Sequence, residues 1–199
     1  MRTTPQGPGH PSIKSTFLSA LDAYDLPTAE HSSRVGSLAA ALGRKIDLDD
    51  TQVEDLGLGG LLHDVGKTLL APEILFKAGP LNMEEWDEIK RHPILGSEML
   101  LDALPEHQAV AEAIITHHER PDGLGYPFGL RGDQIPLAGR IIAIADVYDA
   151  ATNPRIYRSG QFTAKDAQSY LHDNRGRQFD GDLVEVFIDM LSSLDASHQ

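Results

Sequence analysis

The sequence contains no cysteine, which excludes disulfide bonds, thiolate metal ligands and cysteine nucleophiles. Any bound metal must therefore be held by nitrogen and oxygen atoms. No apolar run approaches the roughly 20 residues of a membrane-spanning helix, and the N-terminus lacks the hydrophobic core of a signal peptide. The default expectation is a cytoplasmic location without membrane contact.

Basic residues are also scarce. The chain has 17 Lys and Arg against 30 Asp and Glu, for a formal net charge of -13. This charge disfavours duplex nucleic acid and anionic membrane surfaces as partners. A small anionic substrate would need a locally positive site.

The 199 residues, of which 41% are hydrophobic, are enough for one well-buried domain. Apolar residues recur mainly at helical spacing, as in the stripe Val35, Leu38, Leu42 and Ile46, and this predicts an all-α fold. We predict a flexible Pro/Gly-rich tail over residues 1–12, one domain over 13–192 and a polar tail over 193–199.

Two features divide the helical pattern. Asn82 followed by Glu85 predicts a capping box that opens a helix, and Pro93 suits the first turn of the next helix, so His92 falls at their junction. The glycine-rich segment 120–136 has no helical periodicity and is expected to be a long ordered loop or small hairpin.

Three polar residues, His63, Asp64 and Lys67, follow directly after an apolar helical segment. An imidazole and a carboxylate can both bind a divalent metal, a carboxylate can bridge two metals, and lysine can contact a phosphate. The alternative interpretation is a capped helix end with a local ion pair between Asp64 and Lys67.

Of two adjacent histidines, His117 continues the apolar stripe of Val110 and Ile114, and His118 continues that of Ala111 and Ile115. Both rings are therefore expected to point inward, where each needs a polar partner. Shared metal coordination and separate structural hydrogen bonds are both possible explanations.

Asp146 lies within the apolar helical run after Arg140, where an unpaired carboxylate would be costly. It therefore needs a cation. Asp149 shares the same helix face and could orient a ligand. The alternative for either aspartate is a structural salt bridge to Arg140 or Arg155.

Two further histidines are weaker candidates: His31, which we expect at the start of a helix, and His92. Together the candidates can hold two octahedral metals and leave positions for water and substrate. The predicted ligand set is His31, His63, Asp64, His92, His117, His118 and Asp146.

The segment 117–127 reads HHERPDGLGYP and resembles the HD-GYP signature HHExxDGxGYP, while HDVGK at 63–67 resembles the HDxGK motif of the same family. Shorter matching pieces surround His31, His92, Ile135 and Asp146, so the resemblance spans about residues 24–187. It implies an HD-superfamily helical bundle in which a long loop carries the Gly-Tyr-Pro motif, and it makes 13–192 a catalytic domain.

The resemblance further implies that the seven candidates hold two divalent metals, most plausibly iron or manganese, with Asp64 as the bridge. The implied reaction is hydrolysis of cyclic di-GMP to pGpG, with GMP as a further product, through a metal-bridging hydroxide. Two alternatives stay open: a cyclic-dinucleotide receptor with negligible turnover, and a phosphohydrolase that acts on another cyclic dinucleotide or nucleotide.

Four residues are implied to contact substrate: Lys67, Asp149, Arg155 and Arg158. Without the resemblance, the two arginines would be interpreted as part of a solvated loop. The family's loop motif is associated with dinucleotide recognition and protein contacts, so Gly125, Tyr126 and Pro127 are a candidate protein-partner surface. A structural loop anchor explains the same three residues.

Pro27 marks a departure from part of the family. Some members bind a third metal through a glutamate one helical turn before the first histidine, and this chain has Pro27 at that place. Proline has no ligating side chain, so we predict two metals.

Overall fold

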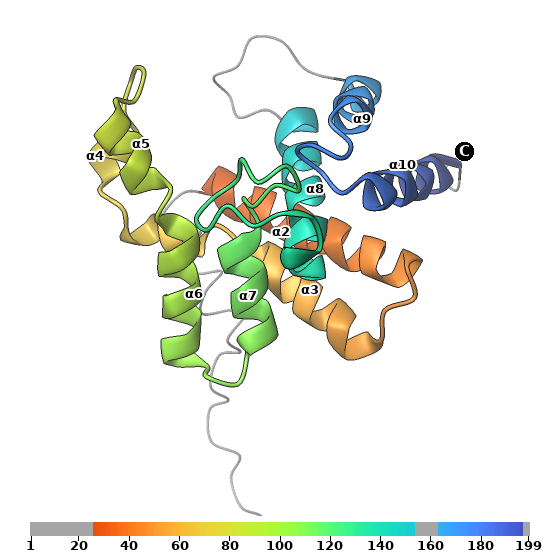
Figure 1. The fold of residues 1–199 in the computed structure, drawn as a ribbon, viewed down its shortest axis with the longest axis horizontal. Coiled ribbons are helices and arrows are strands. Elements are labelled where there is room, and N and C mark those ends of the chain that lie inside the picture. Colours follow the sequence, from red (N-terminus) through yellow and green to blue (C-terminus); the bar gives the residue numbers. More distant parts are fainter. Residues whose placement is uncertain (1–25, 154–162, 197–199) are drawn as a thin grey trace, which may run out of the picture.

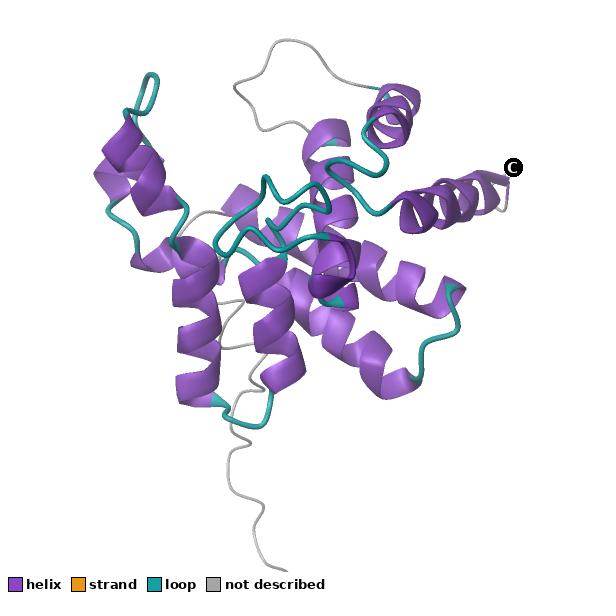
Figure 2. Cartoon of the chain, viewed as in Figure 1, coloured by secondary structure: helices purple, strands orange, loops and turns teal. Residues whose placement is uncertain are grey.

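The computed structural model describes residues 26–153 and 163–196, and the regular structure within them is helical (Figure 2). The only β-type pairings in these ranges are two isolated bridges. The predicted all-α fold is confirmed. In chain order, the elements are α2 (Leu26–Lys45), α3 (Asp50–Leu62), the 3₁₀ helix η1 (Val65–Leu69), α4 (Pro72–Leu75), α5 (Met83–Ile89), α6 (His92–Ala103), α7 (Gln108–Thr116), the 3₁₀ helix η2 (Gly132–Gln134), α8 (Leu137–Thr152), α9 (Ala164–Asp173) and α10 (Gly181–Ala196).

Helix boundaries follow local capping chemistry. Asn82 and Glu85 form the predicted reciprocal capping box at the start of α5. Pro93 lies in the first turn of α6, so His92 becomes the first residue of that helix. The expectation that His31 begins a helix is wrong, because α2 starts five residues earlier and His31 lies in its second turn.

Two apolar clusters of buried side chains form the core. The larger cluster joins α2 and α8 to α9 and α10, and the smaller one joins α3 to α6 and α7. Helix α8 packs against α2, α3 and α7, and in Figure 1 it stands near the centre of the molecule. His63, directly after α3, lies beside Asp146 of α8, with Nε2 3.7 Å from Oδ1.

The turn after α3 packs tightly against the start of α6, and Gly66 makes this possible. A Cβ atom at Gly66 would lie 2.0 Å from the carbonyl oxygen of His92 and 2.5 Å from the amide nitrogen of Gly96. Backbone-to-backbone contact of this kind excludes any side chain. The close approach places Asp64 beside His92.

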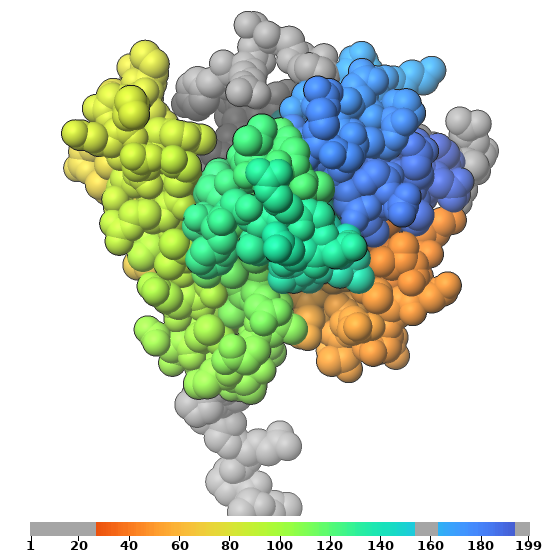
Figure 3. Space-filling model, in the orientation of Figure 1, coloured from red at the N-terminus to blue at the C-terminus, as the bar shows by residue number. Residues whose placement is uncertain are grey.

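The segment predicted as a loop or small hairpin crosses the face shown in Figure 3, between α5 and α6 on one side and α9 on the other. It is a loop with one antiparallel bridge, between Asp122 and Arg131. Glu119 is buried and accepts hydrogen bonds from the backbone nitrogens of Phe128 (2.6 Å) and Leu130 (2.9 Å). These bonds bind the loop to the end of α7.

The predicted N-terminal tail, 1–12, lies outside the described residues. Helix α10 continues to Ala196 and so includes the first four residues of the segment predicted as a C-terminal tail. Within the described ranges, no helix has both the length and the apolar character that crossing a membrane requires.

Replacing Phe187 by Ala tests the larger apolar cluster. Phe187 is fully buried and contacts the ring of Tyr148 edge-on at 5.3 Å between centroids. We expect the free energy of unfolding in urea to fall by about 3–5 kcal/mol. Met83→Ala, at a side chain 84% exposed, is the control and should change it by less than about 0.5 kcal/mol. Equal effects of the two substitutions would contradict this assignment of the core.

Candidate metal centre

The structure brings all seven predicted ligands together from five helices and their ends. His31 lies in α2 and Asp146 in α8, whereas the other five lie at helix termini. Those five are His63 and Asp64 after α3, His92 at the start of α6, and His117 and His118 after α7. Three helix termini and the interiors of two helices thus converge on one site.

The ligand atoms form two groups, within each of which all atoms lie within 4.8 Å of one another. One group contains Asp64, His92, His117 and His118, and the other contains His31, His63 and Asp146. The groups adjoin, because His63 Nε2 lies 3.4 Å from Asp64 Oδ2 and 3.7 Å from Asp146 Oδ1. Asp64 is therefore placed between the histidines of both groups.

Three histidines, His63, His92 and His117, share one hydrogen-bond arrangement. Each directs Nδ1 to the carbonyl oxygen three residues earlier, at 2.6 to 2.7 Å. A carbonyl oxygen only accepts, so Nδ1 carries the proton and the Nε2 lone pair of the neutral ring points into the centre. This is the orientation that metal-binding histidines adopt.

The contacts between these inward atoms fit a bound cation. The Nε2 atoms of His92 and His117 face each other at 3.5 Å, and in this tautomer both present lone pairs. His63 Nε2 and Asp64 Oδ1 are buried and have no hydrogen-bond partner among the described residues. Buried acceptors that face one another are unfavourable unless a cation lies between them. Their nitrogen and oxygen donors suit a divalent transition metal.

Burial lowers the pKa of His118 to about 3 and that of His117 well below its usual value, so both rings are neutral at pH 7. Burial alone would raise the pKa of Asp64, but the charge of Lys67 and the imidazole of His63 hold it well below its ordinary value. His117 and His118 are thus neutral and Asp64 is ionised, which are the protonation states that bind metals.

Asp149 orients His31 from outside the ligand groups. His31 Nδ1 donates to Asp149 Oδ2 at 2.7 Å, and Arg34 pairs with the same carboxylate at 2.7 and 3.0 Å. His31 Nε2 lies 3.0 Å from Asp146. Although burial lowers the pKa of His31, the bonds to the two aspartates raise it to about 9. The expected role of Asp149 in orienting a ligand agrees with this geometry.

The alternative salt bridge from Asp146 or Asp149 to Arg140 is wrong, because Arg140 pairs with Asp133 and Asp180. Arg155, the other partner considered, lies outside the described residues, as does Arg158. The local ion pair between Lys67 and Asp64 is present, with Nζ 2.6 Å from Oδ2. The two interpretations of Asp64, an ion-pair partner and a metal ligand, are therefore compatible.

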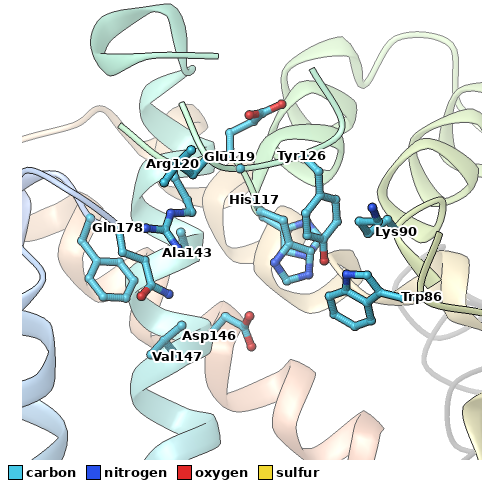
Figure 4. Close-up of a pocket in the computed structure, with 14 residues that line it drawn as sticks. Trp86, Lys90, His117, Glu119, Arg120, Tyr126, Ala143, Asp146, Val147 and Gln178 are labelled. Atoms are coloured by element: carbon cyan, nitrogen blue, oxygen red, sulfur yellow. The ribbon is translucent and has the colours of Figure 1, made fainter. Parts of the chain in front are cut away.

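A cavity of about 550 Å³ opens over the centre, and His117, His118 and Asp146 form part of its lining. Figure 4 shows Trp86, Lys90 and Tyr126 on one side of it and Arg120 and Gln178 on the other. Lys90 and Arg120 place cationic groups in the cavity lining of an acidic protein, and each is paired with a carboxylate, Asp87 and Asp122, at 2.6 Å.

The loop motif contributes to the cavity through Tyr126, whose ring lies 4.7 Å from that of His118 between centroids. Gly125 allows this approach, because a Cβ there would lie 2.4 Å from the amide nitrogen of Arg120. Pro127 follows across a cis peptide bond. The outward apolar area of the loop belongs to Leu124 and Phe128, which are 73% and 58% exposed.

Several site residues were not predicted from the sequence. Arg34 could have been found from its position one turn after His31, and Glu119 from its place beside the histidine pair. Trp86 and Gln178 carry no local signal, because the cavity is formed only when α5 and the turn after α9 meet the loop.

Fold and site together define a helical domain with a two-part candidate metal centre below an open cavity. A sequence model of the family described as HD domain matches residues 19–183. The chain belongs to the HD domain family, and its resemblance to the HD-GYP branch is confirmed by its relatives.

A cyclic di-GMP phosphodiesterase of Pseudomonas aeruginosa is 41% identical over 179 residues, which cover 90% of this chain and 42% of that protein. A 3'3'-cGAMP-specific phosphodiesterase of Vibrio cholerae is 36% identical over 171 residues, which cover 85% of this chain and 33% of that protein. The chain thus spans less than half the length of these curated relatives.

Two solved structures share the fold. An HD-GYP-type protein from Bdellovibrio bacteriovorus has a TM-score of 0.63 at 27% identity, over 83% of this chain and 52% of that chain. A cyclic GMP-AMP specific phosphodiesterase of V. cholerae has a TM-score of 0.70 at 20% identity, over 90% of this chain and 49% of that chain.

Asp149→Asn tests the orienting role of this carboxylate. An amide cannot accept from both His31 and Arg34 with the strength of a carboxylate, so we expect Mn²⁺ affinity, measured by calorimetric titration, to fall about 10- to 100-fold. Asp133→Asn removes a carboxylate that is 98% exposed and should leave the affinity unchanged. An Asp149→Asn protein with native affinity would show that the hydrogen bond to His31 does not support metal binding.

Proposed function

We propose that this chain is a metal-dependent phosphodiesterase that hydrolyses cyclic di-GMP to linear pGpG and, by a second hydrolysis, to GMP. The observation that carries the proposal is the contact between the two buried ligand groups, with Asp64 between them, at the base of a cavity that also presents cations. This arrangement suits a phosphate held over two metals.

The seven predicted residues would hold two divalent ions, one for each ligand group. Bound there, the ions would polarise a phosphate oxygen and make water acidic enough to act as a nucleophile near neutral pH. Iron and manganese suit mixed imidazole and carboxylate ligands of this kind.

The protein's own residues orient the substrate. Lys67 is about one quarter exposed beside Asp64, so its ammonium can contact a phosphate oxygen while it stays close to the carboxylate. In the overall reaction, water adds across one phosphodiester bond: hydroxyl joins phosphorus, the bond from phosphorus to the 3′ oxygen breaks, and a proton goes to that oxygen. Tyr126 covers His118 and restricts water at the outer side of the centre.

The relatives favour a cyclic dinucleotide as substrate but include two kinds. Proteins named for cyclic di-GMP and for 3'3'-cGAMP match this chain at 41% and 36% identity. We propose cyclic di-GMP as a substrate, with 3'3'-cGAMP as a second one. A receptor without turnover is a less favoured alternative, because the chain keeps Lys67 and every ligand beside the cavity.

Protein partners would approach through the outward face of the loop. Tyr126 and Leu124 both line the cavity, but Leu124 and Phe128 are 73% and 58% exposed, so a partner would meet mainly these two side chains. This contact surface would be separate from the proposed catalytic centre.

Asp64→Ala tests the proposed activity. Protein loaded with Mn²⁺ or Fe²⁺ should convert cyclic di-GMP to pGpG, and the substitution should lower the rate at least about a hundredfold, because several kcal/mol of charge stabilisation are lost. Product separation by chromatography gives the rate. The control is Asp133→Ala, at an exposed carboxylate. Native protein that binds cyclic di-GMP without forming product would favour the receptor.

The metal content gives a separate test. We expect two tightly bound ions per chain in protein purified without chelators, as measured by elemental analysis. Pro27 lies in the first turn of α2, one turn before His31, and offers no ligand there. Three tightly bound ions per chain would overturn the prediction.

A further inference from the structure

The two walls of the cavity differ in chemistry. Trp86 of α5 and Lys90, directly after α5, stand with Tyr126 on one side, whereas Arg120 and Gln178 lie next to each other on the other side (Figure 4). A cyclic dinucleotide has two bases on either side of its phosphate ring. One phosphate over the metal centre would therefore direct one base toward each wall.

Arg120 is held in one orientation by Asp122. Its Nε and Nη2 atoms donate to the two carboxylate oxygens of Asp122 at 3.0 and 2.6 Å. The Nη1 amino group remains outside this ion pair. A bidentate pair fixes the plane of the guanidinium, so Nη1 is a donor with a defined direction.

Gln178 is held by Tyr170. The Tyr170 hydroxyl donates to Gln178 Oε1 at 2.8 Å, which assigns the other end of the amide, the NH₂ group, to the cavity side. Tyr170 packs edge-on against the buried ring of Phe179, at 6.3 Å between centroids, and Phe179 adjoins Gln178 in the chain. The amide is therefore held from two directions.

A backbone hydrogen bond brings these two units together. The amide nitrogen of Asp122 donates to the carbonyl oxygen of Arg177 at 3.0 Å. The loop that carries Arg120 is thus joined to the turn that carries Gln178. The wall presents two donors side by side, one from a guanidinium and one from an amide.

We propose that Arg120 and Gln178 form a guanine-reading subsite, in which these two donors recognise one base of a cyclic dinucleotide. Guanine presents two adjacent acceptors, O6 and N7, on one edge, whereas adenine presents an acceptor at N7 and a donor at N6. Two donors match guanine, and one of them opposes the N6 amino group of adenine. Selectivity arises because a mismatched polar group that the base covers is left unpaired.

The opposite wall has no such preference. The Trp86 indole and the Tyr126 ring offer surfaces on which any base can stack, and Lys90 adds a charge for phosphate. The subsite on the Arg120 side requires guanine, and the subsite on the Trp86 side accepts guanine or adenine. The expected order of use is cyclic di-GMP and 3'3'-cGAMP together, followed by cyclic di-AMP.

This inference rests on the proposed function, and its test compares three substrates. The quantity to measure is the ratio of kcat/KM for cyclic di-GMP to that for cyclic di-AMP, with 3'3'-cGAMP as the third substrate. In native protein the ratio should exceed about ten. Gln178→Glu replaces the amide donor by an acceptor and should lower the ratio at least about tenfold.

Tyr170→Phe is the second variant, because it keeps the ring against Phe179 but frees the amide to turn over. It should lower the ratio by a smaller factor, about threefold, without the charge change of the glutamate. Gln108→Glu makes the same charge change at an exposed position and should leave the ratio unchanged. Trp86→Ala should weaken all three substrates by similar factors.

The two proposals fail in different ways. If native protein hydrolyses none of the three dinucleotides, the proposed function fails, and calorimetric affinities for the same three ligands then replace kcat/KM in the ratio. A native preference for cyclic di-AMP would overturn the guanine subsite. So would an unchanged ratio in both Gln178→Glu and Tyr170→Phe.

Discussion

Hydrogen bonds on Nδ1 determine where four histidines of this centre direct their Nε2 atoms, and the other features of the site depend on that constraint. His63 and His117 are held by backbone carbonyls of the helices they follow, His92 by the carbonyl of Ile89 at the end of α5, and His31 by Asp149. Helix ends supply free carbonyl groups, which explains why the ligands gather at termini. For the three histidines bonded to carbonyls these bonds also fix the tautomer, and the Nε2 atoms of all four rings converge before any cation binds.

This convergence has a cost in stability. Unpaired buried acceptors such as Asp64 Oδ1 each cost about 1–3 kcal/mol, and the opposed lone pairs of His92 and His117 add repulsion. Two apolar clusters flank the centre and supply the compensating stability, with Phe187 in one and Leu62 in the other. A bound cation would remove the cost, so metal binding and folding stability are linked through these atoms.

The features that depend on short-range sequence patterns were predicted correctly. The capping box at Asn82, the position of His92 and the helical class all follow from short-range patterns. The grouping of the seven candidate residues rested on the combination of their chemistry, and the structure places them together. Trp86 and Gln178 could not be predicted, because their role exists only where separate elements enclose a cavity. The start of α2 was misplaced, since His31 has no cap signal of its own.

The distribution of charge connects the centre to its substrate. A chain of formal net charge -13 repels an anionic dinucleotide at long range, so attraction must come from nearby cations. Lys67 lies at the metal centre, and Lys90 and Arg120 lie on opposite walls of the cavity. Because Arg120 is already paired with Asp122, its net charge is largely neutralised and its remaining donor serves direction more than attraction. Lys67 and Lys90 are paired as well, with Asp64 and Asp87 at 2.6 Å, but each ammonium keeps further N–H groups that can turn toward a phosphate. We therefore assign phosphate binding to these lysines and the metals, and base selection to the fixed guanidinium of Arg120.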